Sequence, residues 1–295
     1  MITPSVWVCY ESGYRFFDID ISIIIPTYNR KELLMQTLSS IDRCKKEGIK
    51  LEVIIVDDGS SDGSEETIKK QEYNFNYHYH YHEDKGYRVS LSRNVGAKLS
   101  RGRILAFVDS GMIVGSNFLK AHKKLHDESQ NLAVIGYMYA IEQNLSKSSR
   151  EKLSQLYLKQ NVDEFCNSIV NSHEFSDIRE PVFEASSDTL TRLPYPWAIF
   201  WTGNVSIKRE LYNKTQGFDE NYTSWGGEDV DFGYSLYRLN CTFQLSRDGF
   251  AIRIPRKKEN IKTNNLLAKE NREYFYNKYK TPEVETLLNG KAIEM

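Results

Sequence analysis

The chain has no long apolar stretch. No segment of its 295 residues approaches the roughly 20 consecutive apolar residues that a membrane-spanning helix needs. Residues 1–18 also lack the basic start and the following apolar run that are typical of a secretory signal peptide. From these two absences we expect a cytoplasmic protein without a transmembrane segment.

Cysteine is scarce, and neither sign of charge is in excess. The 4 cysteines lie far apart and show no metal-ligand spacing, so we expect free, buried thiols at Cys9, Cys44, Cys166 and Cys241. The formal net charge is -1, which provides no overall field to recruit nucleic acid or an anionic membrane. We therefore expect no nucleic-acid partner.

Aromatic residues, by contrast, are abundant, with 19 Tyr, 14 Phe and 4 Trp. Exposed rings suit carbohydrate binding, although an aromatic ring is more often part of a core than a binding platform. The chain is long enough to bury a large core as one domain or as two tightly joined halves.

Two apolar runs and the segment between them predict the start of a sheet. Residues 21–26 form a β-branched run that ends at a proline, and residues 51–56 form a second run after a helix with leucines on one side. Strands buried on both faces are typical of a parallel sheet, whose ligands bind beyond the carboxyl ends of the strands. The polar residues that directly follow these two strands are Tyr28, Asn29, Asp57 and Asp58.

Further strands follow at regular intervals. Residues 77–82 alternate between tyrosine and histidine, which predicts a strand with tyrosines on one face and histidines on the other. Three histidines on one face could hold a metal, but no carboxylate falls in register with them, so packed or partly solvated rings are the favoured interpretation. Apolar runs at 104–108, which ends at Asp109, and at 132–138 bring the pattern to about five strands.

The second half of the chain is less regular. Periodicity is poor over residues 139–196, apart from a helical patch near 153–165, so we interpret this segment as variable or mobile. After it we expect a strand at 197–207, two short strands at 242–246 and 251–254, and a mixed polar helix at 264–280.

An acidic motif follows a glycine pair late in the chain. The stretch Trp225–Tyr234 contains Glu228, Asp229 and Asp231, and apolar residues recur at helical spacing up to Leu239. The carboxylates therefore lie at the start of a helix, where its dipole favours the ionised form. An ionised carboxylate beside a glycine-opened gap can remove a proton from an acceptor hydroxyl. A helix cap is the alternative for Asp229 alone, but three acids exceed what capping needs.

Short motifs at predicted strand ends cover most of the chain, from about residue 21 to 254. They are Pro26–Arg30, Val56–Ser60, Glu83–Tyr87, Ser92–Ala97, Phe107–Asp109, Thr202–Asn204 and Trp225–Asp229. In this order they resemble the inverting family 2 glycosyltransferases, and the last two are similar to the galactosyltransferase-like and chondroitin-polymerase-like branch of that family. Each motif alone is weak, whereas their order makes a strong signal.

The resemblance implies a fold and a reaction. The fold would be GT-A, a Rossmann-like α/β architecture with a mostly parallel central sheet flanked by helices and an acceptor-side portion toward the C-terminus. The reaction would transfer a sugar from a nucleoside diphosphate donor, UDP-linked by preference, to an acceptor, with inversion at the anomeric carbon.

The resemblance also assigns roles to individual residues. Asp229 matches the general base and Glu228 an acceptor-binding carboxylate, while Asp58 matches the carboxylate that recognises the nucleobase. The acceptor-side residues are Trp225, Gly226, Gly227 and Asn204. The donor-side residues are Pro26, Thr27, Tyr28, Arg30, Asp58, Arg93, Asp109 and Ser110.

Two metal ligands of the family are absent from this sequence. Gly111 replaces the last acid of the family's D-x-D motif, and residues 251–258 contain no histidine. One carboxylate plus the diphosphate would hold Mn²⁺ or Mg²⁺ only loosely, so a divalent metal is doubtful. Cationic side chains are then expected to stabilise the leaving diphosphate, and the candidates are Lys85, Arg93, Arg253 and Arg256. For the basic run 256–258, a solvated surface patch is an equally open interpretation.

We expect one GT-A domain over residues 1–255, with a nucleotide-binding half at about 18–115 and an acceptor half at about 116–255, then a basic segment and helical tail over 256–295. A non-catalytic protein that binds a nucleotide sugar or carbohydrate is the alternative, although the intact Glu228–Asp229 pair favours an enzyme. A sugar nucleotidyltransferase is a weaker hypothesis, because no glycine-rich, lysine-bearing phosphate loop follows the first strand. The donor sugar, the acceptor and the oligomeric state stay open.

Overall fold

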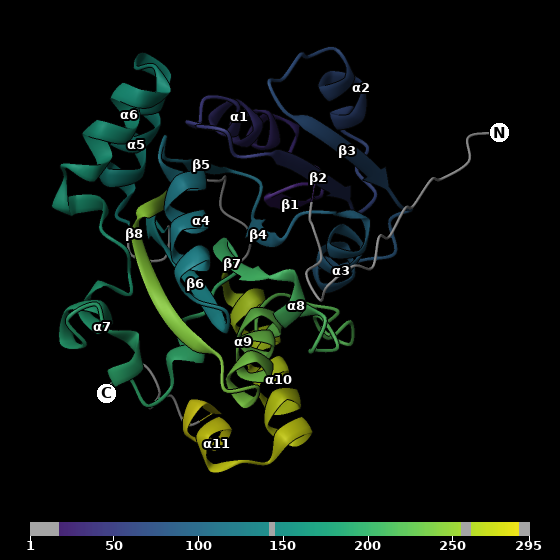
Figure 1. Cartoon of the computed structure of the whole chain (residues 1–295), viewed down its shortest axis with the longest axis vertical. Coiled ribbons are helices and arrows are strands. Elements are labelled where there is room, and N and C mark those ends of the chain that lie inside the picture. Colours follow the sequence, from purple (N-terminus) through teal and green to yellow (C-terminus); the bar gives the residue numbers. More distant parts are fainter. Residues whose placement is uncertain (1–17, 142–144, 255–260, 289–295) are drawn as a thin grey trace.

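The computed structural model describes residues 18–141, 145–254 and 261–288. These residues form an eight-stranded sheet in the order β3-β2-β1-β4-β7-β6-β8-β5, with helices on both faces (Figure 1). The first four strands in this order are mutually parallel: β3 (Asn76–Tyr81), β2 (Leu51–Asp57), β1 (Ile21–Thr27) and β4 (Ile104–Val108). The expected α/β architecture is confirmed.

The remaining four strands are mixed in direction. β7 (Asn204–Lys208) is antiparallel to both β4 and β6 (Leu132–Tyr139), and β8 (Thr242–Arg253) is parallel to β6. The short strand β5 (Met112–Val114), which the sequence did not reveal, pairs antiparallel with β8 at the edge.

Two predicted strand boundaries were wrong. The strand expected at 197–207 starts only at Asn204, because Pro196–Ile199 form a 3₁₀ turn (η4) whose residues are buried in the core. The two strands expected at 242–246 and 251–254 are the single strand β8. The register shifts between its two paired segments, because residues 247–250 of β8 lie opposite only one residue of β6, between Gly136 and Met138.

Alternate residues of the parallel strands face two separate cores. Ile21, Ile23 and Ile25 face the core covered by α1 (Lys31–Asp42), α2 (Ser64–Lys69) and α4 (Phe118–Glu128). Ile24 faces the opposite core, which is covered by α3 (Val89–Leu99), α9 (Glu228–Arg238), α10 (Ile261–Tyr279) and α11 (Pro282–Leu288). Burial on both faces explains why these strands are continuous apolar runs.

The segment interpreted as variable or mobile is largely helical in its described part. It contains α5 (Lys147–Lys159), α6 (Val162–Val170), η2 (His173–Phe175), α7 (Glu180–Ala185) and η3 (Leu190–Arg192), and residues 142–144 lie outside the described ranges. Side by side, α5 and α6 pack against the ends of β5 and β8 through residues such as Leu153 and Phe165 (Figure 1). Each helix buries only a short apolar stripe, which explains the weak periodicity. A short helix, α8 (Arg209–Tyr212), follows β7.

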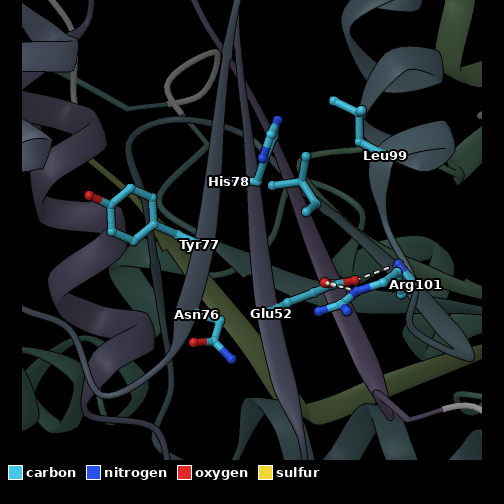
Figure 2. A pocket seen from close by; sticks show the side chains of 7 residues that line it. Glu52, Asn76, Tyr77, His78, Leu99 and Arg101 are labelled. Atoms are coloured by element: carbon cyan, nitrogen blue, oxygen red, sulfur yellow. Dashed lines mark hydrogen bonds and ion pairs between the residues drawn. The ribbon is translucent and has the colours of Figure 1, made fainter. Parts of the chain in front are cut away.

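The alternating tyrosine and histidine segment forms β3, as predicted. Tyr77 and Tyr79 pack against the core on the side of α1 and α2. His78, together with Glu52 and Arg101, lines a pocket beside β2 and β3 (Figure 2). Because Glu52 lies near the start of β2, this pocket is at the amino ends of the strands, away from the edge where Asp58 lies.

The structure also bears on two of the absences in the sequence. Within the described ranges, no helix is both long enough and apolar enough to cross a membrane. Cys44, Cys166 and Cys241 are free and buried, and burial raises the pKa of each thiol to about 12. Cys9 lies outside the described residues.

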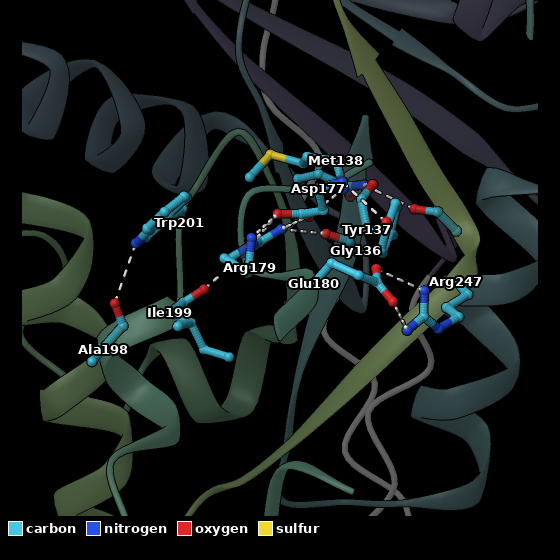
Figure 3. A network of polar contacts seen from close by, with 12 residues as sticks. Gly136, Tyr137, Met138, Asp177, Arg179, Glu180, Ala198, Ile199, Trp201 and Arg247 are labelled. Atoms are coloured by element: carbon cyan, nitrogen blue, oxygen red, sulfur yellow. Dashed lines mark hydrogen bonds and ion pairs between the residues drawn. The ribbon is translucent and has the colours of Figure 1, made fainter. Parts of the chain in front are cut away.

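A buried ion pair attaches the segment before α7 to the sheet (Figure 3). Nη2 of Arg179 donates to Oδ2 of Asp177 at 2.6 Å and to the carbonyl of Gly136 at 3.1 Å, and Nη1 donates to the carbonyl of Ile199 at 2.9 Å. Oδ2 of Asp177 also accepts from the backbone N of Met138 at 2.7 Å. Both charged side chains are buried, so their mutual neutralisation is required for this packing.

Replacing Asp177 with alanine should therefore strongly destabilise the fold. Asp177→Ala leaves the buried Arg179 guanidinium without its counter-ion, and we expect a loss of about 3–5 kcal/mol in the free energy of unfolding, measured by urea denaturation. The control is Arg247→Ala, because Arg247 makes exposed ion pairs with Glu180 and Asp188 and its loss should cost about 1 kcal/mol or less. Equal losses in the two variants would contradict the structural role given to the buried pair.

Candidate active site

The candidate site lies at the carboxyl ends of the parallel strands. Asp58 directly follows β2, and its backbone N donates to the carbonyl of Thr27 at the end of β1 at 2.9 Å. Asp109 directly follows β4, and the next residue, Ser110, donates from its hydroxyl to the carbonyl of Pro26 at 2.8 Å. The ends of three neighbouring strands are thus tied together, as expected for the ligand-binding edge of such a sheet.

Arg93 of α3 joins the two halves of this site. Nη1 donates to Oε1 of Glu228 at 3.0 Å, and Nη2 donates to Oδ1 of Asp109 at 3.1 Å. The guanidinium also lies over the ring of Phe218, 5.4 Å from its centroid. The side chain is only 4% exposed, and burial opposes its charge, but Asp109 and Glu228 raise the pKa of Arg93 above its usual value. Arg93 therefore stays charged and links the end of β4 to the start of α9.

Cationic side chains surround Asp109. Burial alone would raise the pKa of this carboxyl, but Arg93, Arg253 and Arg30 together hold the pKa below its usual value. Nη2 of Arg253, at the end of β8, lies 3.6 Å from Oδ2 of Asp109. Asp109 is therefore an ionised carboxylate among guanidinium groups, and three of the predicted donor-side residues are brought together with it.

Asp229 lies in the first turn of α9, as the sequence predicted. The turn begins after Gly227, and both Gly226 (φ 98°) and Gly227 (φ 102°) adopt left-handed backbone angles that favour glycine. Oδ1 of Asp229 accepts a hydrogen bond from the backbone N of Val230 at 2.8 Å. Burial and then the charge of Glu228 raise the pKa of Asp229 to about 7, while Arg93 and the Val230 N–H oppose the shift. A carboxyl with this pKa can accept a proton near neutral pH.

Tyr87 belongs to the same site, although the sequence gave it no role. Its side chain is 36% exposed. Desolvation and then the charge of Glu228 raise the pKa of its hydroxyl well above the usual value, and Asp109 and Asp229 add to the shift. The hydroxyl therefore stays neutral beside the acidic cluster. Its place in the motif Glu83–Tyr87 was the available sequence signal.

Asp58 anchors the loop that carries Tyr87. Its Oδ1 accepts from Nε2 of His82 and from Nη2 of Arg88, both at 2.8 Å, and its Oδ2 accepts from the backbone N of Arg88 at 2.9 Å. Nearby, the hydroxyl of Tyr28 donates to Oδ2 of Asp84 at 2.7 Å. A nucleobase that bonds to Asp58 would have to share these oxygens with His82 and Arg88. The sequence did not indicate that His82 and Arg88 bind Asp58, because both contacts depend on how the loop between β3 and α3 folds back toward the end of β2.

The other predicted site residues lie in varied surroundings. Thr27 is buried beside Pro26, Arg30 precedes α1, and Lys85 is exposed with Nζ 3.9 Å from Oε2 of Glu83. Trp225 is 41% exposed, next to the glycine pair. Arg256 lies outside the described residues.

The expectation that Asn204 contacts substrate needs correction. Its side chain is completely buried, and Nδ2 donates to the carbonyls of Tyr137 at 3.3 Å and Gly249 at 2.8 Å. Asn204 therefore bridges β7, β6 and β8 inside the sheet. The resemblance of Thr202–Asn204 to a motif of the family suggested a site, but β7 begins at Asn204 and places the amide in the core.

The residues near Asp109 do not fit a divalent cation. Gly111 has φ 94°, and a Cβ built there would point toward the side chain of Leu33, at 3.5 Å, in the apolar surroundings of α1. Asp109 itself is engaged by guanidinium groups, which repel a cation. In the part of the chain that the structure describes, no three His, Cys, Asp or Glu side chains group as metal ligands. Hard cations need several oxygen ligands, and this set does not supply them.

Comparison with known protein families gives two matches. The family described as glycosyl transferase family 2 matches residues 22–186, and the N-terminal domain of galactosyltransferase matches residues 185–259.

Among curated proteins, the chain is 33% identical over 239 residues to validoxylamine A glucosyltransferase of Streptomyces hygroscopicus subsp. limoneus, covering 81% of this chain and 52% of that protein. It is 31% identical over 284 residues to chondroitin synthase of Escherichia coli, covering 90% of this chain and 40% of that protein. The chain thus spans about half or less of the length of these relatives.

Solved structures share the fold at low sequence identity. TarS 1–349 of S. aureus in complex with UDP-GlcNAc superposes with a TM-score of 0.62 at 17% identity, over 94% of this chain and 73% of that chain. The mannosyltransferase PcManGT of Pyrobaculum calidifontis, in complex with GDP-Man and Mn²⁺, superposes with a TM-score of 0.58 at 16% identity, over 95% of this chain and 74% of that chain. These likenesses establish the GT-A architecture.

The raised pKa of Asp229 predicts a pH-dependent gain in stability for Asp229→Asn. The folded-state pKa of this carboxyl is about 7, above its ordinary value of 3.8, so the group lowers the stability of the fold progressively as pH rises from about 4 to about 7, and the full cost is present above 7. Asp229→Asn removes that cost, so we expect its unfolding temperature at pH 8 to exceed that of the wild type by several degrees, at about 2–4 °C per kcal/mol. The gain should shrink as pH falls from 7 toward 4. Thermal unfolding at several pH values measures it, and a gain independent of pH would contradict the assigned shift.

Proposed function

Because this chain belongs to glycosyl transferase family 2, we propose that it transfers a sugar from a nucleoside diphosphate donor to an acceptor hydroxyl, with inversion at the anomeric carbon. The proposed donor is UDP-linked, which is supported by the fold shared with the UDP-GlcNAc complex of TarS. One observation carries the proposal: a carboxyl with a pKa of about 7, Asp229, lies in a site that also contains the ion pairs of Arg93.

In the proposed reaction Asp229 is the general base. The acceptor oxygen attacks the anomeric carbon as its proton passes to Asp229, the new carbon–oxygen bond forms, and the bond from carbon to the diphosphate oxygen breaks on the opposite face. The electron pair of the broken bond leaves with the nucleoside diphosphate. Glu228 cannot replace Asp229 freely, because its Oε1 is held by Nη1 of Arg93 at 3.0 Å.

Guanidinium groups are proposed to stabilise the leaving diphosphate in place of a metal ion. Arg253 and Arg30 lower the pKa of Asp109 at the donor edge. Both can contribute positive charge near the diphosphate oxygen on which negative charge develops. Arg93, the other donor-side arginine of the sequence analysis, is committed to Asp109 and Glu228, so it acts as a positioning residue. The poor fit of the Gly111 region to a cation supports this choice.

The acceptor is proposed to be carbohydrate-like. The exposed ring of Trp225 beside Gly226 and Gly227 offers an apolar face on which a sugar ring can stack. The names of the relatives, which include glucosyltransferases and polysaccharide synthases, agree with a polyhydroxylated acceptor. We further propose a cytoplasmic location, which is supported by the buried free thiols of Cys44, Cys166 and Cys241.

The base role of Asp229 predicts a loss of transfer without a loss of donor binding. Asp229→Asn should lower kcat by about 10²–10⁴-fold, while a UDP-sugar still raises the unfolding temperature. In the wild type, kcat/KM should fall below a pH of about 7, and Glu228→Gln should move this fall to lower pH because the charge of Glu228 raises the pKa of Asp229. Full activity of Asp229→Asn would exclude Asp229 as the general base, and a wild type that transfers no sugar would favour the non-catalytic sugar-binding alternative.

The arginine-based donor site predicts activity without divalent metal. Transfer should be unchanged in excess EDTA, whereas Arg253→Gln should reduce kcat by about 10²-fold because it removes a charge that stabilises the leaving group. Lys120→Gln is the control, since Lys120 is exposed and pairs with Glu47 rather than Asp109. Activity that disappears in EDTA and returns with Mn²⁺ would overturn this part of the proposal.

A further inference from the structure

The C-terminal helix α10 contacts the loop that leads to Asp229. Asn271 of α10 is 9% exposed, and its Nδ2 donates to the carbonyl of Gly226 at 2.6 Å, with longer contacts to the carbonyls of Ser224 at 3.2 Å and Trp225 at 3.4 Å. Its Oδ1 accepts from the hydroxyl of Ser224 at 3.3 Å. One side chain thus holds three consecutive residues of the loop.

The two glycines of the loop lie directly beside α10, at ordinary van der Waals distance. A Cβ built on Gly226 would lie 3.4 Å from Cβ of Ala268, and one built on Gly227 would lie 3.5 Å from Cβ of Asn271. Glycine lacks a Cβ and adopts positive and negative φ about equally readily, so the pair Gly226 and Gly227, both at positive φ, gives this loop considerable intrinsic freedom. An external restraint is therefore needed if the next residues, Glu228 and Asp229, are to keep one geometry.

A second attachment fixes the other side of the α9 start. Nζ of Lys278 donates to Oδ2 of Asp231 and to Oδ2 of Asp219, both at 2.7 Å, and the hydroxyl of Tyr279 donates to Oδ1 of Asp231 at 2.7 Å. The hydroxyl of Tyr222 completes the shell of Asp231 at 3.0 Å. The third acid of the motif therefore binds α10, which explains why the motif contains more acids than the proposed chemistry uses.

We infer that Asn271 is a positioning residue for the acceptor side of the site. This inference rests on the proposed function. Asn271 binds the carbonyls of Ser224, Trp225 and Gly226, and thereby positions the exposed ring of Trp225 and the first turn of α9. The donor edge is built from other elements, since Asp58 follows β2 and Asp109 follows β4. Removing its amide donor should impair use of the acceptor and leave donor binding intact. Lys278 attaches α10 to Asp231, and Asn271 holds the loop of residues 224–226 in one conformation.

The decisive variant is Asn271→Asp, which keeps the size of the side chain and loses the N–H donor. A carboxylate facing three carbonyl oxygens cannot hold the loop, so kcat/KM for the acceptor should fall at least about 10-fold. The affinity for the UDP-sugar, measured by thermal shift, should stay within about twofold of the wild type. Lys269→Ala is the matched control on the same helix, since Lys269 is exposed and lies 4.0 Å from Glu273, and it should change neither quantity.

A second measurement tests positioning without relying on activity. Amide hydrogen exchange of the peptide covering residues 222–232, followed by mass spectrometry, should be at least about 10-fold faster in Asn271→Asp than in the wild type. Peptides from β1 and β2 serve as internal references and should exchange at unchanged rates.

The outcomes separate the inference from the proposed function. Unchanged exchange and unchanged acceptor kinetics in Asn271→Asp would overturn the inference, and so would an equal loss of donor affinity, which would indicate a general structural defect. If the wild type transfers no sugar, the proposed function fails, and the exchange rates alone then decide whether Asn271 holds the loop.

Discussion

A single buried guanidinium holds the site together. Arg93 bonds Asp109 at the end of β4 and Glu228 at the start of α9, two residues that are far apart in the sequence. The same positive charge keeps Asp109 ionised and limits the rise in the pKa of Asp229. The interaction that joins the end of β4 to the start of α9 therefore also lowers the pKa of the proposed base, against the larger effects of burial and Glu228.

The polar groups of this cluster are not fully matched. Among the described residues, Nε of Arg93 and Oε2 of Glu228 are buried and make no hydrogen bond. Buried unpaired groups cost stability, and proteins retain them mainly where they serve a purpose. Together with the raised pKa of Asp229, they indicate that the start of α9 gives up stability for reactivity.

Much of the framework could be predicted from the sequence because it depends on local pattern. The runs at β1, β2 and β4 are apolar on both faces, and the turn at Gly227 precedes a periodic helix, so the strand ends and Asp229 were placed correctly. What the sequence did not reveal depends on contacts between residues far apart in the chain. Asn204 is drawn into the core by β6 and β8, Asp58 is occupied by a loop that folds back through Arg88, and Asn271 reaches a motif well before it in the chain. No spacing rule encodes such contacts, since they arise only when the sheet has formed.

The backbone at Gly111 has a consequence for redesign. Substituting aspartate for Gly111 would complete the D-x-D pattern in the sequence. The left-handed angle would strain the new residue, whose Cβ would lie 3.5 Å from the side chain of Leu33. Placing a cation-binding carboxylate at this position would require the turn after β4 to be rebuilt first. An acidic side chain at this position and the backbone angle of the turn would therefore have to change together.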